Sequence, residues 1–356
     1  MAQQHLDPTD PTAGPVAGEA LAGYLRAQAT EFLRALRLHR ETGPAASNGT
    51  EESVDAARAL RRSVRRISGS MHTFRPLLEA DWSEGLRPEL AWLSGTLSME
   101  NAYACRLERL LLALHRLSGA VFPTQTGVAA AVSPAGAAGP PVPPPTDRGN
   151  LTVGAAKAGA LLERQLTLAR TRAHSTALQA LGSSRFHAVA DKVAVLASEV
   201  PLTATATAPT TDLRPLAAAA EERLTDAVTA LPLVTAGSPY NAEALIHGLS
   251  PDPAPHPQDA PWHQVRLLLR LHRYAREALY GTGGPIDVRL LTAGQALDRH
   301  RDASEAAAAA ASAARTPRIA PATAYALGVL HADQRHEVEA ARFAFQQSWQ
   351  KQVVST

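Results

Sequence analysis

The sequence predicts an all-α protein, and three observations support this fold class. Apolar residues recur at helical spacing in many segments of the 356-residue chain. No segment shows a convincing alternation of apolar and polar residues, the pattern expected of a half-buried strand. Hydrophobic residues make up 45% of the chain but aromatic residues only 4%, so Ala, Leu and Val must fill the core. Such small side chains favour close packing of helices.

The first half of the chain is expected to form four helices. Residues 1–18 are polar and rich in proline, so we predict a disordered tail there. Apolar side chains then recur every three or four positions, as an amphipathic helix requires. The predicted helices cover residues 19–41, 51–71, 86–97 and 100–117. Turns are expected at residues 43–48, at Pro76 and at residues 81–83.

A change in composition separates the first half from the second. Residues 119–149 are of low complexity, rich in Pro, Ala and Gly, and are predicted to form a linker between halves at 19–118 and 150–353. The predicted helices of the second half cover residues 150–180, 186–198, 213–230, 262–279, 305–315 and 322–350. The 305–315 segment is an alanine tract and therefore a strong helix former.

Charge and targeting signals narrow the class of protein. The net charge is only +2, which is not typical of a bulk nucleic-acid binder. One cysteine, Cys105, excludes an intramolecular disulfide and a thiolate-rich zinc site. The N-terminus lacks the pattern of a signal peptide, and no apolar run approaches the ~18 residues of a membrane helix. We therefore expect a soluble cytoplasmic protein without a membrane partner.

Two basic segments share one pattern of cations. Segments 57–78 and 262–277 both carry cationic residues at offsets 0, 3 and 7, which fall on one face of a helix. These residues are Arg58, Arg61 and Arg65 in the first segment and His263, Arg266 and Arg270 in the second. Neither 57–78 nor 261–276 contains an acidic residue, and like charges on one face repel each other. An anionic ligand would offset this repulsion.

Explanations without a ligand remain open for these two rows of cations, here called stripes. Only three of the 35 Lys and Arg residues are lysine, and codon bias in a GC-rich genome would also produce such an excess of arginine. Each stripe is also compatible with a solvated basic face, or with arginines paired to glutamates of neighbouring helices. The common register of two stripes in two halves of one chain favours the anion-binding interpretation.

The two basic segments resemble the motifs of the CHAD family (conserved histidine α-helical domain). The second segment is similar to a family pattern at His263, Arg266, Arg270, Arg273, Tyr274 and Glu277. Residues 295–305 resemble a further family segment, a turn, at Leu297, His300 and Asp302. The first segment is similar at Arg61, Arg65, Arg66, Thr73, Phe74, Arg75 and Pro76. It departs from the pattern where Arg58 takes the place of a histidine and Ser68 that of an arginine.

The resemblance implies both a fold and a function. It implies two four-helix-like bundles related by a pseudo-twofold internal duplication, with a basic cleft between them. It also implies binding of inorganic polyphosphate and association with polyphosphate granules. The candidate binding residues are Arg58, Arg61, Arg65, Arg66, His263, Arg266, Arg270 and Arg273, with Arg62, His72, Tyr274 and Arg276 as secondary candidates. Tyr274 is either a hydrogen-bond donor to phosphate or a packed core residue.

Three other functions were weighed against polyphosphate binding. A polyphosphate hydrolase would need carboxylates to hold Mg²⁺, but the basic segments have none and no P-loop is present, so we predict no enzyme and no catalytic residue. The 13 histidines form no H-x-x-x-H or H-E-x-x-H pair, so no metal and no cofactor are expected. RNA or DNA is the alternative partner, although the basic segments lack interleaved Phe or Trp for base stacking.

Overall fold

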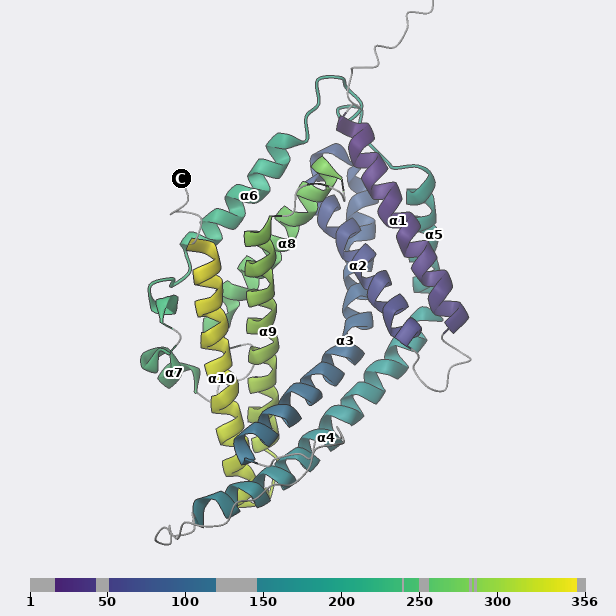
Figure 1. The fold of residues 1–356 in the computed structure, drawn as a ribbon. Helices are drawn as coiled ribbons and strands as arrows, with labels where there is room; N and C mark the ends of the chain where they lie inside the picture. The colour runs from purple at the N-terminus through teal and green to yellow at the C-terminus, as the bar shows by residue number, and fades with distance from the viewer. Residues whose placement is uncertain are drawn as a thin grey trace, which may run out of the picture. The chain divides into compact units, whose positions relative to one another are not determined.

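The computed structural model describes residues 17–42, 51–119, 146–238, 240–249, 256–281, 284 and 287–350. Its long helices are α1 (Ala17–Thr42), α2 (Glu51–Thr73), α3 (Ala80–Ser118), α4 (Thr146–Leu181), α5 (Ser184–Ser198), α6 (Arg214–Thr229), α8 (Ala260–Tyr280), α9 (Val288–Ala314) and α10 (Pro321–Gln350) (Figure 1). The short ones are α7 (Ala242–Gly248) and the 3₁₀ turns η1 (Arg75–Leu77), η2 (Thr235–Gly237) and η3 (Pro257–Asp259). Within the described ranges there is no strand, only an isolated bridge between Leu78 and Leu202. The all-α prediction is confirmed.

The chain forms two compact units. Unit 1 contains Met1–Met99, Ala173–Leu231 and Gln264–Gly294, and unit 2 contains Glu100–Arg172, Pro232–His263 and Gln295–Thr356. Each unit therefore combines segments from both sides of the predicted linker, which differs from the division into halves 19–118 and 150–353. Of the predicted tail and linker, residues 1–16 and 120–145 lie outside the described residues. The pseudo-twofold duplication stays a prediction.

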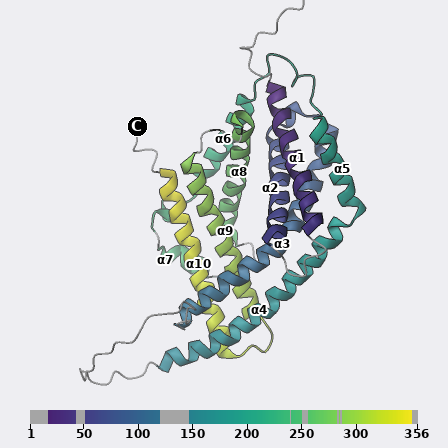
Figure 2. The same cartoon turned by 45° about the vertical axis from the view of Figure 1, so that its right-hand side comes forward.

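Unit 1 is built on helices with a narrow apolar face. In α2, Leu60, Val64, Ile67 and Met71 are fully buried, at the 3–4-residue spacing that places them on one side of the helix. Helix α1 packs against α2 and α5, and these helices run side by side in Figures 1 and 2. Because the buried face of α2 takes every third or fourth residue, its arginines are left for the other faces.

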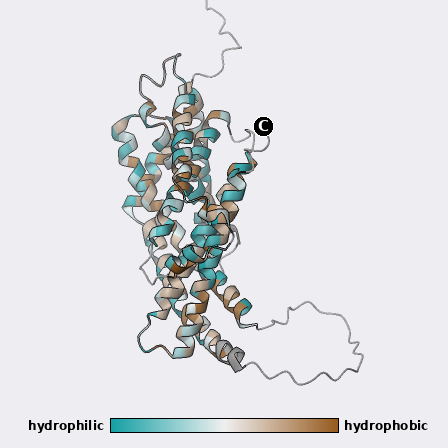
Figure 3. Ribbon diagram, turned by 90° about the vertical axis from the view of Figure 1, so that its left-hand side faces the viewer, coloured by the Kyte–Doolittle hydropathy of each residue, from teal (hydrophilic) through white to brown (hydrophobic). Residues whose placement is uncertain are grey.

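Unit 2 has a core rich in alanine. The predicted alanine tract is helical and buries Ala306, Ala310 and Ala313 against leucines such as Leu327. Hydrophobic and hydrophilic residues both occur along the helices, as the brown and teal colours of Figure 3 show. Small side chains let helix backbones approach closely: a Cβ added at Gly154 would lie 2.2 Å from a carbonyl oxygen of α10.

Two helices, α3 and α9, differ from their predicted bounds. The segment from Ala80 to Ser118 is one helix, so the turn expected at 81–83 and the break between 97 and 100 do not occur, although Pro88 lies inside it. Leu86, Leu90 and Leu93 around this proline are fully buried. Each such burial stabilises by about 1.5–3 kcal/mol, enough together to exceed the ~3 kcal/mol that an internal proline costs.

The second error concerns α9, which begins at Val288 rather than near residue 305. The segment 295–305, which resembles a family turn, is therefore helical. The alanine tract identified only the C-terminal part of this helix, although Leu290, Ala293 and Leu297 before it are buried at helical spacing. Helix α7 and the turns η2 and η3 were not predicted.

Candidate anion-binding pocket

A surface pocket of about 440 Å³ lies within unit 1, between helices α2, α3 and α8. Four arginines line it, one from α2, one from α3 and two from α8, together with a histidine and a tyrosine. These residues are Arg65, His72, Arg87, Arg266, Arg270 and Tyr274. Three serines, Ser68, Ser94 and Ser98, complete its polar lining. Among the described residues that line this arginine pocket, none is Asp or Glu.

Helical spacing explains how each wall of the arginine pocket forms. On α8, Arg266, Arg270 and Tyr274 are four residues apart, so they lie along one side of the helix at steps of one turn. On α2, Arg65 and His72 are seven residues apart and share a face for the same reason. Of the two predicted rows of cations, Arg65 from the first and Arg266 and Arg270 from the second line this pocket, whereas Arg58, Arg61 and His263 do not.

Close packing of α2 against α8 depends on Gly69. A Cβ added at Gly69 would lie 2.5 Å from Cδ2 of Tyr274 and 3.3 Å from a methyl carbon of Leu271. Real Cβ atoms do not approach neighbours so closely, so the aromatic ring occupies space that any other residue would need. Gly69 therefore brings the two basic helices together and fixes the Tyr274 ring in the pocket wall.

Two hydrogen bonds orient the cations on the α3 side. Arg65 donates through Nε to Oγ of Ser94 at 3.3 Å. Arg87 donates to Nδ1 of His72 at 3.1 Å, and its other terminal nitrogen lies 3.2 Å from Glu84, which is outside the pocket lining. Partial burial, followed by the charge of Arg87, lowers the pKa of His72 below its usual value. His72 is therefore mostly neutral at neutral pH in the protein without a bound anion.

One predicted cation, Arg66, is neutralised beside the pocket. Arg66 forms two hydrogen bonds to the carboxylate of Glu277, at 2.6 and 3.1 Å. Tyr24 donates a third hydrogen bond to the same carboxylate at 3.2 Å, and burial followed by the charge of Glu277 raises the pKa of Tyr24. Arg66 is thus engaged in joining α2 to α8, and it does not line the arginine pocket.

The other candidate residues lie elsewhere on the same helices. Arg58 is exposed and pairs with Asp55 at 2.5 Å, while Arg276 pairs with Asp287 at 3.1 Å. His263 belongs to unit 2, where its ring lies 5.4 Å from that of His300. The candidates that do not line the pocket are Arg58, Arg61, Arg62, Arg66, His263, Arg273 and Arg276. The structure thus brings together Arg65, His72, Arg266, Arg270 and Tyr274.

Arg87 is the pocket residue that sequence reasoning missed. It lies inside the predicted 86–97 helix but outside the two basic segments, so it was not among the candidate residues. A usable signal was present: Arg87, Ala91, Ser94 and Ser98 form a helical row of small or polar residues. Because a turn was expected at 81–83, the N-terminal part of this helix was not recognised.

A second pocket, in unit 2, is lined by side chains of both charges. It has a volume of about 510 Å³ and is lined by two arginines and two glutamates from α3 and α10. Arg109 donates to Gln334 at 2.5 Å, and Arg116 pairs with Asp333 at 2.8 Å. The lining of this pocket therefore contains carboxylates beside its arginines, whereas the described lining of the arginine pocket contains none.

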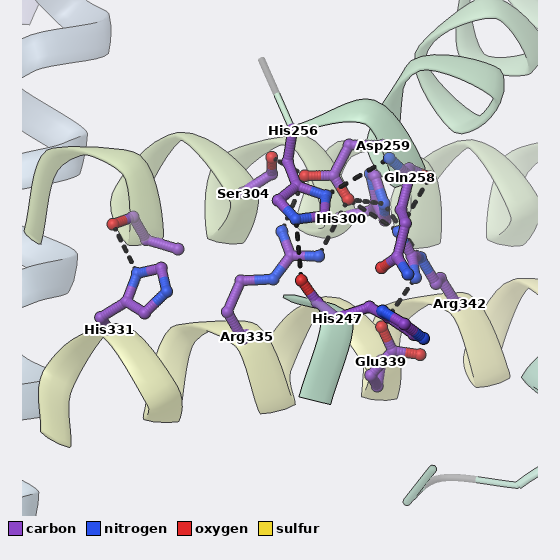
Figure 4. A network of polar contacts seen from close by, with 11 residues as sticks. His247, His256, Gln258, Asp259, His300, Ser304, His331, Arg335, Glu339 and Arg342 are labelled. Atoms are coloured by element: carbon purple, nitrogen blue, oxygen red, sulfur yellow. Dashed lines mark hydrogen bonds and ion pairs between the residues drawn. The ribbon is translucent and has the colours of Figure 1, made fainter. Parts of the chain in front are cut away.

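Unit 2 also contains a buried polar network, which Figure 4 shows around Asp259. The carboxylate of Asp259 is inaccessible to solvent and accepts hydrogen bonds from Arg335 at 2.7 Å, Arg342 at 2.7 Å and Ser304 at 2.5 Å. Arg342 also donates to Glu339 at 2.7 Å. Two carboxylates therefore balance two guanidiniums, as a buried charge cluster requires.

His300 lies inside this network and is kept neutral. Its ring stacks 5.6 Å from the ring of Trp262, and the residue is 1% exposed. Burial, with a smaller effect of the Arg342 charge, lowers the pKa of His300 to about 4. Asp302, the other polar residue of the family-like segment, pairs instead with the adjacent Arg301. The network thus ties the start of α8 to α9 and α10.

Within the part of the chain that the structure describes, no group of three or more His, Cys, Asp or Glu side chains is arranged to hold a metal ion. None of the described helices combines the length and apolar character needed to cross a membrane. The fold and the site define an all-helical protein with an arginine-lined surface pocket.

Comparison with known proteins identifies the family. The CHAD domain profile matches residues 27–311, so the chain belongs to the CHAD domain family, and the resemblance noted in the sequence is confirmed. The chain is similar to the structure of PptA from Streptomyces chartreusis, with 71% identity, a TM-score of 0.75 and coverage of 94% of this chain and 99% of that one. A crystal structure of the CHAD domain from the plant Ricinus communis is 16% identical over 96% of each chain, with a TM-score of 0.48. No curated protein matches the sequence.

Proposed function

We propose that this protein binds inorganic polyphosphate in the arginine pocket, and that it acts as a binding protein rather than an enzyme. The observation that carries the proposal is the convergence of Arg65, Arg87, Arg266 and Arg270 on one pocket whose described lining includes no carboxylate. Guanidiniums that face one pocket from three helices can donate to several oxygens of one polyanion. Membership of the CHAD domain family supports the choice of polyphosphate as the anion.

The chemistry of the pocket suits a linear chain of phosphates. A guanidinium presents donors in a planar fork that matches two phosphate oxygens, and it stays charged at all physiological pH values. Arg266 and Arg270 are one helical turn apart, or roughly 5 to 6 Å, so they can contact successive phosphates of an extended chain. Polyphosphate carries no base, and the described lining of the pocket includes no Phe or Trp and one tyrosine, Tyr274.

A charge-reversal pair tests the proposal. We expect Arg266→Glu combined with Arg270→Glu to weaken binding of linear sodium polyphosphate by more than about 100-fold, because each lost charge-assisted hydrogen bond costs about 1.5–3 kcal/mol. The matched control is Arg34→Glu with Arg37→Glu, which makes the same charge change on α1 at side chains that are 69% and 82% exposed. Isothermal titration calorimetry at fixed salt measures both, and circular dichroism checks folding.

Two outcomes would refute the assignment. Equal weakening by the pocket pair and by the α1 pair would show that only net charge matters. Binding of a single-stranded RNA that polyphosphate fails to displace at equal salt would favour the nucleic-acid alternative. If the pocket is the site, the plot of log affinity against log salt should become shallower by about one for each phosphate contact removed, by analogy with nucleic-acid binding. Recruitment to polyphosphate granules would follow from the same interaction.

A further inference from the structure

The contact between Arg87 and His72 constrains the protonation of the arginine pocket. A terminal nitrogen of Arg87 lies 3.1 Å from Nδ1 of His72. A guanidinium has only donors, so Nδ1 must accept this hydrogen bond and cannot carry a proton. The contact therefore exists only while the imidazole is neutral, with its single proton on Nε2.

The surroundings of His72 contain more positive than negative charge. Arg87 and Glu84 face it from α3, Arg75 from η1 and Arg223 from α6. The one carboxylate of this group, Glu84, is already paired with Arg75 at 2.9 Å and with Arg87 at 3.2 Å. Partial burial and the three guanidiniums together disfavour the imidazolium in the free protein.

A phosphate anion would reverse this balance. His72 is exposed on the pocket lining, and the pocket also receives Arg266 and Arg270 from α8. A phosphate oxygen that accepts from Arg87 takes over the role that Nδ1 has in the free protein. Nδ1 is then released, and the adjacent negative charge favours its protonation. The new N–H can donate to the same anion.

We infer that binding of a phosphate anion in the arginine pocket is coupled to protonation of His72, which makes His72 and Arg87 a pair of anion-binding donors in the complex. This inference rests on the proposed function, because the anion is the polyphosphate of the same pocket. One proton from solvent adds to the Nδ1 lone pair for each occupied pocket, and no group leaves.

The coupling fixes the sign of the pH dependence. Because the bound anion raises the pKa of His72 above its value in the free protein, the extra affinity is fully present below the free-protein pKa. It is lost as the pH rises through the pKa of the complex. Each pH unit between the two pKa values corresponds to up to about a tenfold change in affinity. Long-chain polyphosphate is the suitable probe, since only its few end groups titrate near neutral pH.

Calorimetry can count the protons directly. Long-chain sodium polyphosphate is titrated into the full chain at about pH 6 and at about pH 8, each in two buffers of different ionisation enthalpy. We expect uptake that approaches one proton per occupied pocket at the lower pH, little uptake at the higher pH, and tighter binding at the lower pH. Equal heats in the two buffers at the lower pH would overturn the inference.

Substitution assigns the proton to one residue. His72→Gln keeps a side-chain acceptor for Arg87 but cannot titrate, so the uptake and the extra affinity at low pH should both disappear. The control is His187→Gln on α5, an exposed histidine of the same unit outside the pocket lining, which should keep both. Proton uptake that persists in His72→Gln would overturn this inference but not the proposed function. Insensitivity of binding at about pH 8 to the Arg266→Glu, Arg270→Glu pair would instead overturn the proposed function.

Discussion

Acidification should destabilise this protein through His300, a buried histidine of unit 2. Its pKa is lowered from 6.5 to about 4, mainly because its ring is buried against Trp262 and only 1% of the residue is exposed. Since the folded-state pKa lies below the unfolded value, the neutral ring stabilises the fold above about pH 6.5. This contribution is lost as the pH falls toward about 4, where the unfolded chain binds a proton that the folded chain does not.

The size of the effect follows from the two pKa values. The gap between 6.5 and about 4 corresponds to roughly 3 kcal/mol at full titration, and about 2 kcal/mol of it should be lost between about pH 7 and pH 4.5. Glu339 has the opposite effect, because burial raises its pKa. The pH dependence of the wild-type free energy of unfolding therefore combines several residues. The contribution of His300 is therefore obtained by difference from His300→Gln.

Urea denaturation followed by circular dichroism at a series of pH values measures this difference. His300→Gln should be less stable than the wild type near pH 7, because it disturbs a packed ring, but the gap should narrow by about 2 kcal/mol on acidification. The exposed His187 serves as the control, and His187→Gln should follow the wild-type curve. Parallel curves for wild type and His300→Gln would show that this ring is not held neutral by the fold.

Three further substitutions test the packing. Gly69→Ala places a methyl group 2.5 Å from Cδ2 of Tyr274, so it should lower the free energy of unfolding by about 1–3 kcal/mol and weaken polyphosphate binding; unchanged calorimetric melting would contradict the close packing. Asp259→Asn leaves two buried guanidiniums without their full counter-charge. It should lower the free energy of unfolding, measured by urea denaturation, by about 3–5 kcal/mol. A loss below about 1 kcal/mol would show that Asp259 does not stabilise these guanidiniums. Gly154→Ala meets a carbonyl oxygen of α10 at 2.2 Å and should lower the melting temperature, while Gly23→Ala, with nothing within 4 Å, should leave it unchanged or raise it.

Much of the helical structure could be predicted because single-helix periodicity is a local property. The buried residues of α2 recur at the spacing seen in the sequence, and α1, α5, α6 and α10 lie within a few residues of their predicted bounds. The failures have a common physical cause. Pro88 opposes the helix locally, and only the burial of leucines by other helices outweighs it, which periodicity within one segment does not reveal. The division into two interleaved units depends on contacts between distant segments in the same way.

The candidate site was also predictable only in its local features. The sequence identified the cationic faces of α2 and α8, and Arg65, Arg266 and Arg270 do line one pocket. It did not show that Arg66 is paired with Glu277, because these residues are 211 positions apart in the chain. It did not show the contribution of α3 either, because Arg87 lies outside the two basic segments and joins their arginines only through the tertiary structure. Which arginine is neutralised therefore depends on the tertiary structure.

The arginines of this chain differ in the surroundings that the structure gives them. In unit 2, Arg335 and Arg342 are nearly inaccessible, and two carboxylates neutralise them. In unit 1, Arg66 is neutralised in the same way by Glu277. In the arginine pocket, four guanidiniums share a lining that includes no acid among its described residues, and one of them, Arg87, pairs with Glu84 outside that lining. Because these guanidiniums come from three helices and face one pocket, a flexible polyanion of the kind proposed could accept hydrogen bonds from several of them at once.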